Sequence, residues 1–406
     1  MKTNLTFCFL ILFYAAFSQQ SPASFAESIE KEKQNDYAGA IKALEGSSDS
    51  LSYDVNLRLG WLSGQAGFIK QERRYYLRAA GIRPDAIEPR LGLATSGSTS
   101  EDITDLTGRN KKLLERDPDN KSTNTNLALI YYYNRQYEQA LPYFQKVSEL
   151  YPFDYDANLM LGSTYLKLGR NEEAGDCFKI VLMSSPQDVS AKEGLLAIGR
   201  PFDLKDKMIS AFAVSAALAD QLEYQEAINV LQKVYDPASY FLNMRLGFLS
   251  HLIKAEQQAV SYYKTAANLK PAAIEPWLAC ELPLEAMRNN RELQNVYGAV
   301  FSIDPYNMYA HYKLGVLLYD AKNYSAAYDQ FEQVLKLYPA DYNSLLMLGW
   351  TDQQLNNNTE AKVVFSKVLS LVPDDASAKK GLALKSGKGH NGKPHTHSEY
   401  RVLVKR

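Results

Sequence analysis

The stretch Tyr155–Asp188, YDANLMLGSTYLKLGRNEEAGDCFKIVLMSSPQD, holds the pattern that decides the fold. Leu161 and Tyr165 are four residues apart, which places them on one face of a helix. The segment Gly169-Arg170-Asn171 then has the composition of a turn. Pro186 stops whatever helix precedes it, because proline cannot continue one. The stretch therefore predicts two helices joined by a short turn.

The second of these helices has a matching face. Ala174 and Phe178 have the same four-residue spacing. Gly162 in the first helix and Ala174 in the second are small, as two antiparallel helices require where they come close. The two helices are therefore expected to pack as a hairpin.

Proline shows that this hairpin recurs. Half of the 16 prolines lie on two ladders with steps of 34 residues, and chance does not produce such a ladder. The first ladder is Pro84, Pro118, Pro152 and Pro186, and the second is Pro271, Pro305, Pro339 and Pro373.

The 34-residue unit resembles the tetratricopeptide repeat (TPR), W-x2-L-G-x2-Y…A-x3-F…P. The resemblance implies an all-α, right-handed superhelical solenoid of about ten helix-turn-helix repeats. The family's tryptophan at the fourth position is present only as Trp277, and Ile87–Asn120 is the least regular unit. Clear copies are Lys121–Asp154, Tyr155–Asp188, Met308–Asp341 and Tyr342–Asp375, and weaker copies are Tyr53–Ala86 and Tyr240–Ala273.

A larger repeat is superimposed on the small one. With a shift of 187 residues, Phe25–Arg200 aligns on Phe212–Gly387 without a gap, and Ala86-Ile87-Glu88-Pro89 falls on Ala273-Ile274-Glu275-Pro276. This predicts a tandem duplication, with block 1 at residues 21–200 and block 2 at residues 208–387. Each block ends in one extra helix, expected at 190–198 and 377–384. The junction Gly199-Arg200-Pro201-Phe202-Asp203 is a hinge or a tight connection, and a continuous array is favoured because repeats bury their faces against neighbours.

The two ends of the chain differ from the array. Lys2 and the apolar run Leu5–Phe17 are typical of a signal peptide, residues 1–18, with cleavage expected after Ser18. The run is too short to span a bilayer, which takes about 20 apolar residues. We therefore expect an exported protein, periplasmic or secreted, that is not an integral membrane protein. Residues 388–406 are expected to form a disordered basic tail.

Catalytic signatures are missing from the sequence. There is no phosphate-binding glycine loop, no H-E-x-x-H, no G-x-S-x-G and no paired-cysteine metal site. Cys177 and Cys280 are expected to be buried free thiols, with a disulfide as the less favoured alternative because export permits one. The tail histidines could hold a metal, but a solvated silent tail is favoured: His390, His395 and His397. No enzyme activity, cofactor or metal is predicted.

The balance of charge argues against one class of partner. Lysine plus arginine number 45 and aspartate plus glutamate 46, so the chain has no electrostatic footprint for nucleic acid. The 28 tyrosines are the one compositional excess.

In the repeat family that the sequence resembles, positions 5, 9 and 12 of each first helix form a stripe that lines a concave groove. This chain carries six aromatic residues on that stripe. Aromatics suit both buried seams and binding sites, so packing between first helices and ligand binding remain alternatives. The candidate groove residues are Trp61, Tyr132, Phe248, Tyr312, Tyr319 and Trp350.

Two functions fit these observations. The first is a non-catalytic interaction scaffold that binds a partner protein or peptide in an aromatic groove outside the cytoplasm. The alternative is a periplasmic accessory of polysaccharide export or envelope assembly that contacts glycan, by analogy with similar arrays.

Overall fold

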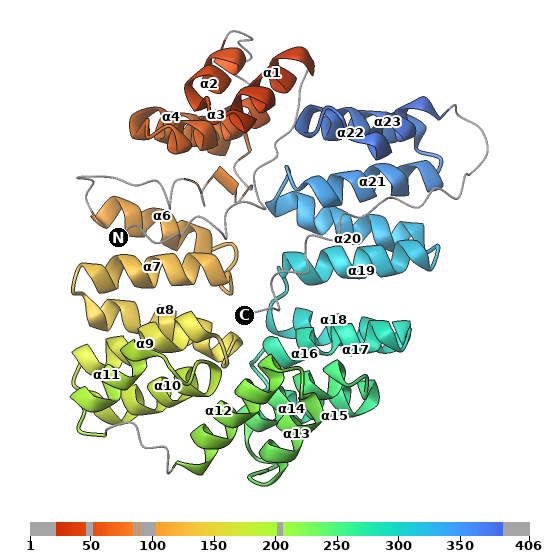
Figure 1. Cartoon of the computed structure of the whole chain (residues 1–406). Coiled ribbons are helices and arrows are strands. Elements are labelled where there is room, and N and C mark those ends of the chain that lie inside the picture. The colour runs from red at the N-terminus through yellow and green to blue at the C-terminus, as the bar shows by residue number, and fades with distance from the viewer. Residues whose placement is uncertain are drawn as a thin grey trace. The chain divides into compact units, whose positions relative to one another are not determined.

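A computed structural model describes residues 22–45, 52–83, 86, 88–89, 92, 103–200 and 206–384. The predicted signal peptide 1–18 and the predicted tail 388–406 lie outside these residues, as does most of 84–102 in the irregular unit. Throughout the part of the chain that the structure describes, the regular elements are α-helices and none is a strand (Figure 1). The predicted all-α TPR solenoid is confirmed.

The helices fall into two compact units. Unit 1 holds residues 1–109 and 311–406, unit 2 holds residues 110–310, and α6 (Ile103–Leu114) and α19 (Met308–Asp320) span the division. The other helices of unit 1 are α1 (Pro22–Lys33), α2 (Tyr37–Glu45), α3 (Tyr53–Gln65), α4 (Ile69–Ile82), α20 (Tyr324–Leu337), α21 (Tyr342–Gln354), α22 (Asn358–Leu371) and α23 (Ala376–Ala383). Those of unit 2 are α7 (Lys121–Tyr133), α8 (Tyr137–Leu150), α9 (Tyr155–Lys167), α10 (Asn171–Ser184), α11 (Val189–Ala197), α12 (Lys207–Asp220), α13 (Tyr224–Gln232), α14 (Tyr240–Leu252), α15 (Glu256–Leu269), α16 (Glu275–Ala279), α17 (Glu281–Ala286) and α18 (Asn290–Ile303).

The first helices begin at the boundaries of the 34-residue frames. In all six frames the first helix starts at the first residue of the frame, as α9 does at Tyr155 and α21 at Tyr342. An aspartate, asparagine or serine before several of these helices accepts a hydrogen bond from the helix N-terminus, as Asp154 does from the Ala157 amide at 2.8 Å. The preceding proline and this cap together set the start of the helix.

Asparagine replaces the family's tryptophan at the fourth position of several first helices. The Asn158 side chain donates to the carbonyl oxygens of Pro152 at 3.1 Å and Asp154 at 2.6 Å. Asn124 and Asn243 make the same pair of bonds to their own turns. The amide therefore ties the first helix to the proline turn with hydrogen bonds, where a tryptophan would have filled the space by packing.

The turn inside each hairpin has one recurring conformation. Its central residue, fifteenth in the frame, has a left-handed backbone, which glycine adopts without steric cost. Gly67 and Gly169 serve in two repeats, but Leu222 has φ 65° at the equivalent place in another. The remaining turns use Asn35, Arg135, Lys254, Arg288, Lys322 and Asn356.

In several of the hairpins a glycine of the first helix contacts an aromatic ring of the second helix. A Cβ on Gly162 would lie 2.9 Å from the Phe178 ring, and one on Gly194 of the following helix would lie 2.3 Å from it. Gly349 and Gly381 hold Phe365 in the same way, at 2.8 and 2.3 Å. The predicted close approach at Gly162 is therefore confirmed. The Phe178 ring and the Phe365 ring each lie between two glycines.

The junction between the predicted blocks is packed. Ile209 of α12 joins the buried cluster formed by α7 to α11, although residues 201–205 are not described. The extra helices expected at 190–198 and 377–384 are α11 and α23. Within unit 2 the array therefore continues past the junction.

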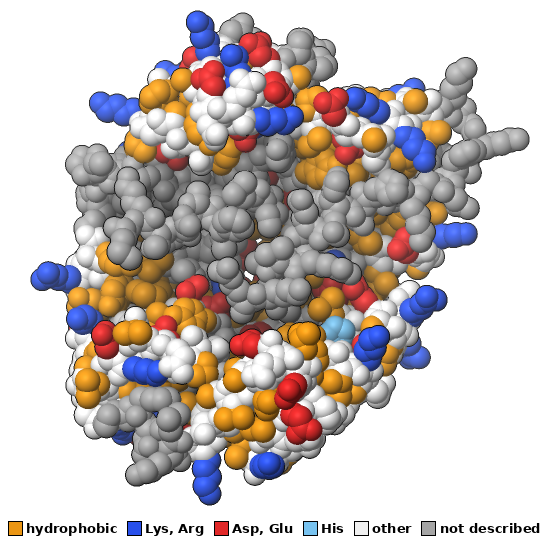
Figure 2. Space-filling model, viewed as in Figure 1, with side chains coloured by type: hydrophobic (Ala, Val, Ile, Leu, Met, Phe, Trp, Pro, Cys, Tyr) orange, Lys and Arg blue, Asp and Glu red, His pale blue; other side chains and the backbone are white. Residues whose placement is uncertain are grey.

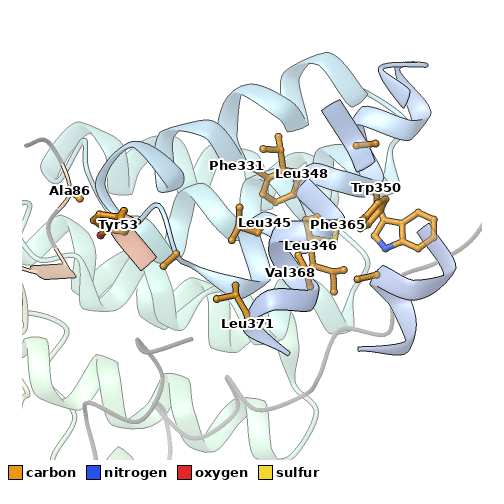
Figure 3. Packing of buried hydrophobic residues seen from close by; sticks show 14 of the residues in the cluster. Tyr53, Ala86, Phe331, Leu345, Leu346, Leu348, Trp350, Phe365, Val368 and Leu371 are labelled. Carbon is orange, nitrogen blue, oxygen red and sulfur yellow. The ribbon is translucent and has the colours of Figure 1, made fainter. Parts of the chain in front are cut away.

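Unit 1 brings together segments from the two ends of the sequence. Helix α1 contacts α22, and Tyr53 and Ala86 join one buried cluster with residues of α20 to α22 (Figure 3). The Glu88 side chain is buried here: one oxygen accepts from the Ala340 amide at 2.9 Å and the other from the Tyr53 hydroxyl at 2.7 Å. Glu88 and Ala340 are 252 residues apart.

Unit 2 contains the same arrangement at residues related by the 187-residue offset. Glu275 accepts from the Phe153 amide at 3.0 Å and from the Tyr240 hydroxyl at 2.9 Å. The Ile274 amide donates to the Leu150 carbonyl at 2.9 Å. We call the Glu88 and Glu275 contacts the glutamate clasps. Each clasp joins a segment of one predicted block to a segment of the other.

Cys177 and Cys280 are free and buried, as the sequence predicts. Burial raises the pKa of the Cys177 thiol and of the Cys280 thiol to about 12. Both thiols therefore stay protonated at neutral pH and pack as small apolar groups.

Candidate binding surface

The six aromatic residues predicted to line a groove all lie on first helices of the repeats. Their surroundings divide them into two groups. Trp350 and Tyr319 are buried, whereas the other four are half-buried.

Trp350 is enclosed by its neighbours. Its side chain is 1% exposed, its ring packs edge-on against Phe365 at 5.2 Å, and its Nε1 donates to Ser377 Oγ at 2.9 Å (Figure 3). Ser377 belongs to α23, the extra helix of the second block. Because α23 covers this position, Trp350 has the environment of a core residue and offers no surface to a ligand.

Tyr319 is 7% exposed and packs against Tyr324 across the hairpin turn, with ring centroids 5.3 Å apart. Burial raises the pKa of the Tyr319 hydroxyl to about 12. The two alternatives for this stripe are packing and ligand binding, and the burial of Trp350 and Tyr319 favours packing for these two residues.

Three of the half-buried residues pack against neighbouring side chains and are partly exposed to solvent. Trp61 packs edge-on against Tyr37 at 6.4 Å, and Tyr312 is tilted against Phe331 at 6.1 Å. Phe248 lies 5.6 Å from the guanidinium carbon of Arg245. Burial lowers the pKa of the Arg245 guanidinium. Each of these three rings is therefore packed on part of its surface and accessible to solvent on the rest.

Tyr132 differs because it belongs to a group of aromatic side chains at the surface. Its ring lies 5.6 Å from that of Tyr133 and 5.3 Å from that of Tyr137, both in edge-on geometry, and 6.4 Å from the buried Phe144. Tyr133 is 75% exposed. We call Tyr132, Tyr133 and Tyr137 the tyrosine cluster; it lies at the turn between α7 and α8 in unit 2.

Tyr133 was not among the residues that the sequence pattern selected. It falls one position beyond the stripe, at the last residue of α7. The signal for Tyr133 in the sequence is the run Tyr131-Tyr132-Tyr133. The residue 187 positions after Tyr133 is Asp320, so the second block does not repeat the third tyrosine of this run. The neighbouring Tyr131 is buried and stacks on Tyr143 at 6.0 Å, whereas Tyr132 joins the cluster to the buried Phe144.

The electrostatics of the surface are mixed. Basic and acidic side chains are interspersed on the face shown in Figure 2. Among the described residues, no group of His, Cys, Asp or Glu is arranged to hold a metal ion. No helix in the described ranges is both long enough and apolar enough to cross a membrane.

Two family models match the chain. Both describe the tetratricopeptide repeat: one covers residues 125–189, which include most of α7 and all of α8 to α10, and the other covers residues 318–384, which include α20 to α23. The chain belongs to the tetratricopeptide-repeat family.

Relatives of this TPR chain include rat DnaJ homolog subfamily C member 3, 26% identical in an alignment of length 329 that covers 75% of this chain and 63% of the rat protein. The human protein O-mannosyl-transferase TMTC3 is 23% identical over 62% of this chain and 28% of its own length. The chain thus spans less than two thirds of either relative. Among solved structures, a tetratricopeptide repeat protein from Parabacteroides merdae is 16% identical, with a TM-score of 0.39, over 64% of this chain and 99% of that chain.

Proposed function

We propose that this TPR protein is a non-catalytic scaffold that binds a partner protein or peptide through half-exposed aromatic side chains outside the cytoplasm. The tyrosine cluster is the observation that carries the proposal. Tyr133 exposes three quarters of its surface, yet Tyr132 beside it is anchored on the core residue Phe144. Exposed aromatic rings on a rigid base are typical of interaction hot spots.

The cluster suits a protein ligand for two physical reasons. A tyrosine offers a large apolar area at little cost in conformational entropy, because only two side-chain torsions are ordered on binding. Each hydroxyl adds a hydrogen-bond donor and acceptor at the rim of the contact. Trp61, Phe248 and Tyr312 are the remaining stripe residues with an accessible side.

The extracytoplasmic location rests on sequence alone. The apolar run Leu5–Phe17 followed by small residues supports export, and Ser18 is the proposed last residue of the signal peptide. The non-catalytic assignment rests on the missing motifs and on the repeat fold, whose arrays bury their own faces and present extended binding surfaces.

Site-specific photo-crosslinking tests the proposal. A photoreactive phenylalanine analogue at Tyr133 should crosslink one discrete partner in native envelope material, whereas the same analogue at Tyr306 should not. Tyr306 is the matched control because it is an exposed tyrosine of the same unit, 47% exposed, outside the cluster. Tyr132→Ala should weaken crosslinking at Tyr133 with the fold retained.

The polysaccharide alternative gives a different outcome in the same experiment. A glycan-bearing product at Tyr133 in place of a protein product would favour contact with sugar rings. Equal crosslinking at Tyr133 and Tyr306, or none at either, would count against the tyrosine cluster as a binding surface.

A further inference from the structure

A second surface feature lies on α4. Lys70, Arg73, Arg74, Leu77 and Arg78 line a shallow hollow of about 460 Å³. Their spacing of three, four, seven and eight residues puts them along one face of the helix, over about 12 Å of its length. In Figure 2 several Lys and Arg side chains project from the region that α1 to α4 form in Figure 1. We call these five residues the basic face.

Two carboxylates that the structure describes, Glu72 and Glu45, lie on α4 or beside it. The one carboxylate on α4, Glu72, is buried. Glu45 of α2 comes within 4.0 Å of Arg74 and accepts a hydrogen bond from Tyr75, whose ring Arg74 covers at 4.7 Å. Among the residues that the structure describes, no carboxylate forms an ion pair with Lys70 or Arg78.

A comparison inside the chain shows that the repeat fold does not require these charges. Helix α15 occupies the position in block 2 that α4 occupies in block 1, with an offset of 187 residues. At the five equivalent positions it has a single cation, Lys264, which is paired with Glu292. The equivalent residues are Gln257, Val260, Ser261, Lys264 and Thr265. The five positions hold four cations in α4 and one in α15, so the cluster of positive charge is specific to α4.

We propose that the basic face of α4 binds an acidic segment of a partner protein, with an apolar side chain of that segment seated on Leu77. Leu77 is 52% exposed, lines the hollow, and lies between Arg74 and Arg78 along the sequence of α4. Charge complementarity selects carboxylates, and the exposed leucine selects a peptide that carries an apolar residue among them. The proposal rests on the scaffold function and assigns that function a second contact point.

The probe is a fluorescein-labelled peptide of glutamates with one central leucine, titrated with the full chain and followed by fluorescence anisotropy. Lys70→Gln with Arg78→Gln should raise Kd about tenfold, and Leu77→Ala should raise it about threefold. Binding should weaken as the salt concentration rises from about 50 to about 300 mM. The matched control is Lys336→Gln with Lys362→Gln, which removes two exposed cations from second helices α20 and α22 of the same unit.

The proposal would be overturned if the peptide does not bind, or if the α4 variant and the control variant bind it equally well. It would also be overturned if phosphatidylglycerol vesicles bind in a manner that depends on Lys70 and Arg78 while the peptide does not bind. Inorganic phosphate that competes as well as the peptide would also overturn it, because Leu77 would then have no role. Tyr133→Ala should leave peptide binding unchanged. Failure on α4 therefore leaves the crosslinking test of the tyrosine cluster intact, and failure of that test leaves this one intact.

Discussion

Replacing Glu88 by alanine should open unit 1 where its two distant segments meet. The substitution removes the acceptor of two hydrogen bonds, from the Ala340 amide at 2.9 Å and from the Tyr53 hydroxyl at 2.7 Å, and it leaves both donors buried. A buried donor without a partner costs about 1–3 kcal/mol. The expected loss is about 3 kcal/mol for the contact as a whole.

Hydrogen exchange of the peptide that contains Ala340 measures this loss locally. A loss of about 3 kcal/mol corresponds to an exchange rate of the Ala340 amide that is roughly 100-fold higher. Glu275→Ala is the matched control, because it removes the other clasp and should expose the Phe153 amide in unit 2 instead. An Ala340 exchange rate that stays within about threefold of the wild-type rate would refute the reasoning.

The same clasp predicts a dependence on pH. Burial raises the pKa of Glu88 from 4.5 to about 8, so the folded state holds this proton more tightly than the unfolded chain does. The contribution of Glu88 to the free energy of unfolding is then full below pH 4.5, falls as the pH rises, and is lost above about pH 8. Glu88→Gln keeps an acceptor for the Ala340 amide but cannot ionise. It should therefore flatten the decline in stability that the wild type shows between about pH 4.5 and pH 8, and an equally steep decline in the variant would contradict this assignment.

Four further predictions follow from single positions. Gly349→Ala places a Cβ 2.8 Å from Phe365 and should lower the free energy of unfolding by about 1–3 kcal/mol. The control Gly298→Ala in α18 places a Cβ that meets nothing within 4 Å and should raise the free energy of unfolding by about 0.5–1 kcal/mol. Equal effects of the two variants in chemical denaturation would contradict the close approach at Gly349. Leu222→Asn relieves a left-handed leucine that is 71% exposed and should raise the melting temperature slightly, and a fall would show that the leucine is needed there. Trp350→Ala should cost about 3–5 kcal/mol, so a variant that melts like the wild type would return Trp350 to the list of groove candidates. N-terminal sequencing of the exported protein should begin at Gln19, and a chain that begins at Met1 would refute the cleavage site.

The repeat could be predicted from the sequence. Leu161, Tyr165, Ala174 and Phe178 set the faces of one hairpin, and the proline ladder set its period. These signals sufficed because a TPR hairpin is held by contacts within about 34 residues, so that the pattern of one stretch specifies its own fold. The six frames set by this pattern coincide with the observed starts of the first helices.

The sequence could not decide which stripe residues are accessible. Tyr132 and Tyr319 are related by the 187-residue offset and sit in the same local geometry, with a tyrosine ring 5.3 Å away in each case, yet Tyr132 is half-buried and Tyr319 is buried. Trp350 is buried because α23 covers it, whereas Trp61 keeps an accessible side. Burial depends on what the next helix brings against the ring, and the pattern within one repeat does not contain that information.

Tertiary structure alone also decided which segments meet over long distances. The Ala-Ile-Glu-Pro segments that hold Glu88 and Glu275 stand out in the sequence as copies of each other. Nothing in their local pattern indicates that Glu88 would accept a hydrogen bond from Ala340, 252 residues away, or Glu275 from Phe153. A helical period specifies one face of one helix, whereas a buried carboxylate obtains its partners from whichever backbone amides the packed array leaves unpaired beside it.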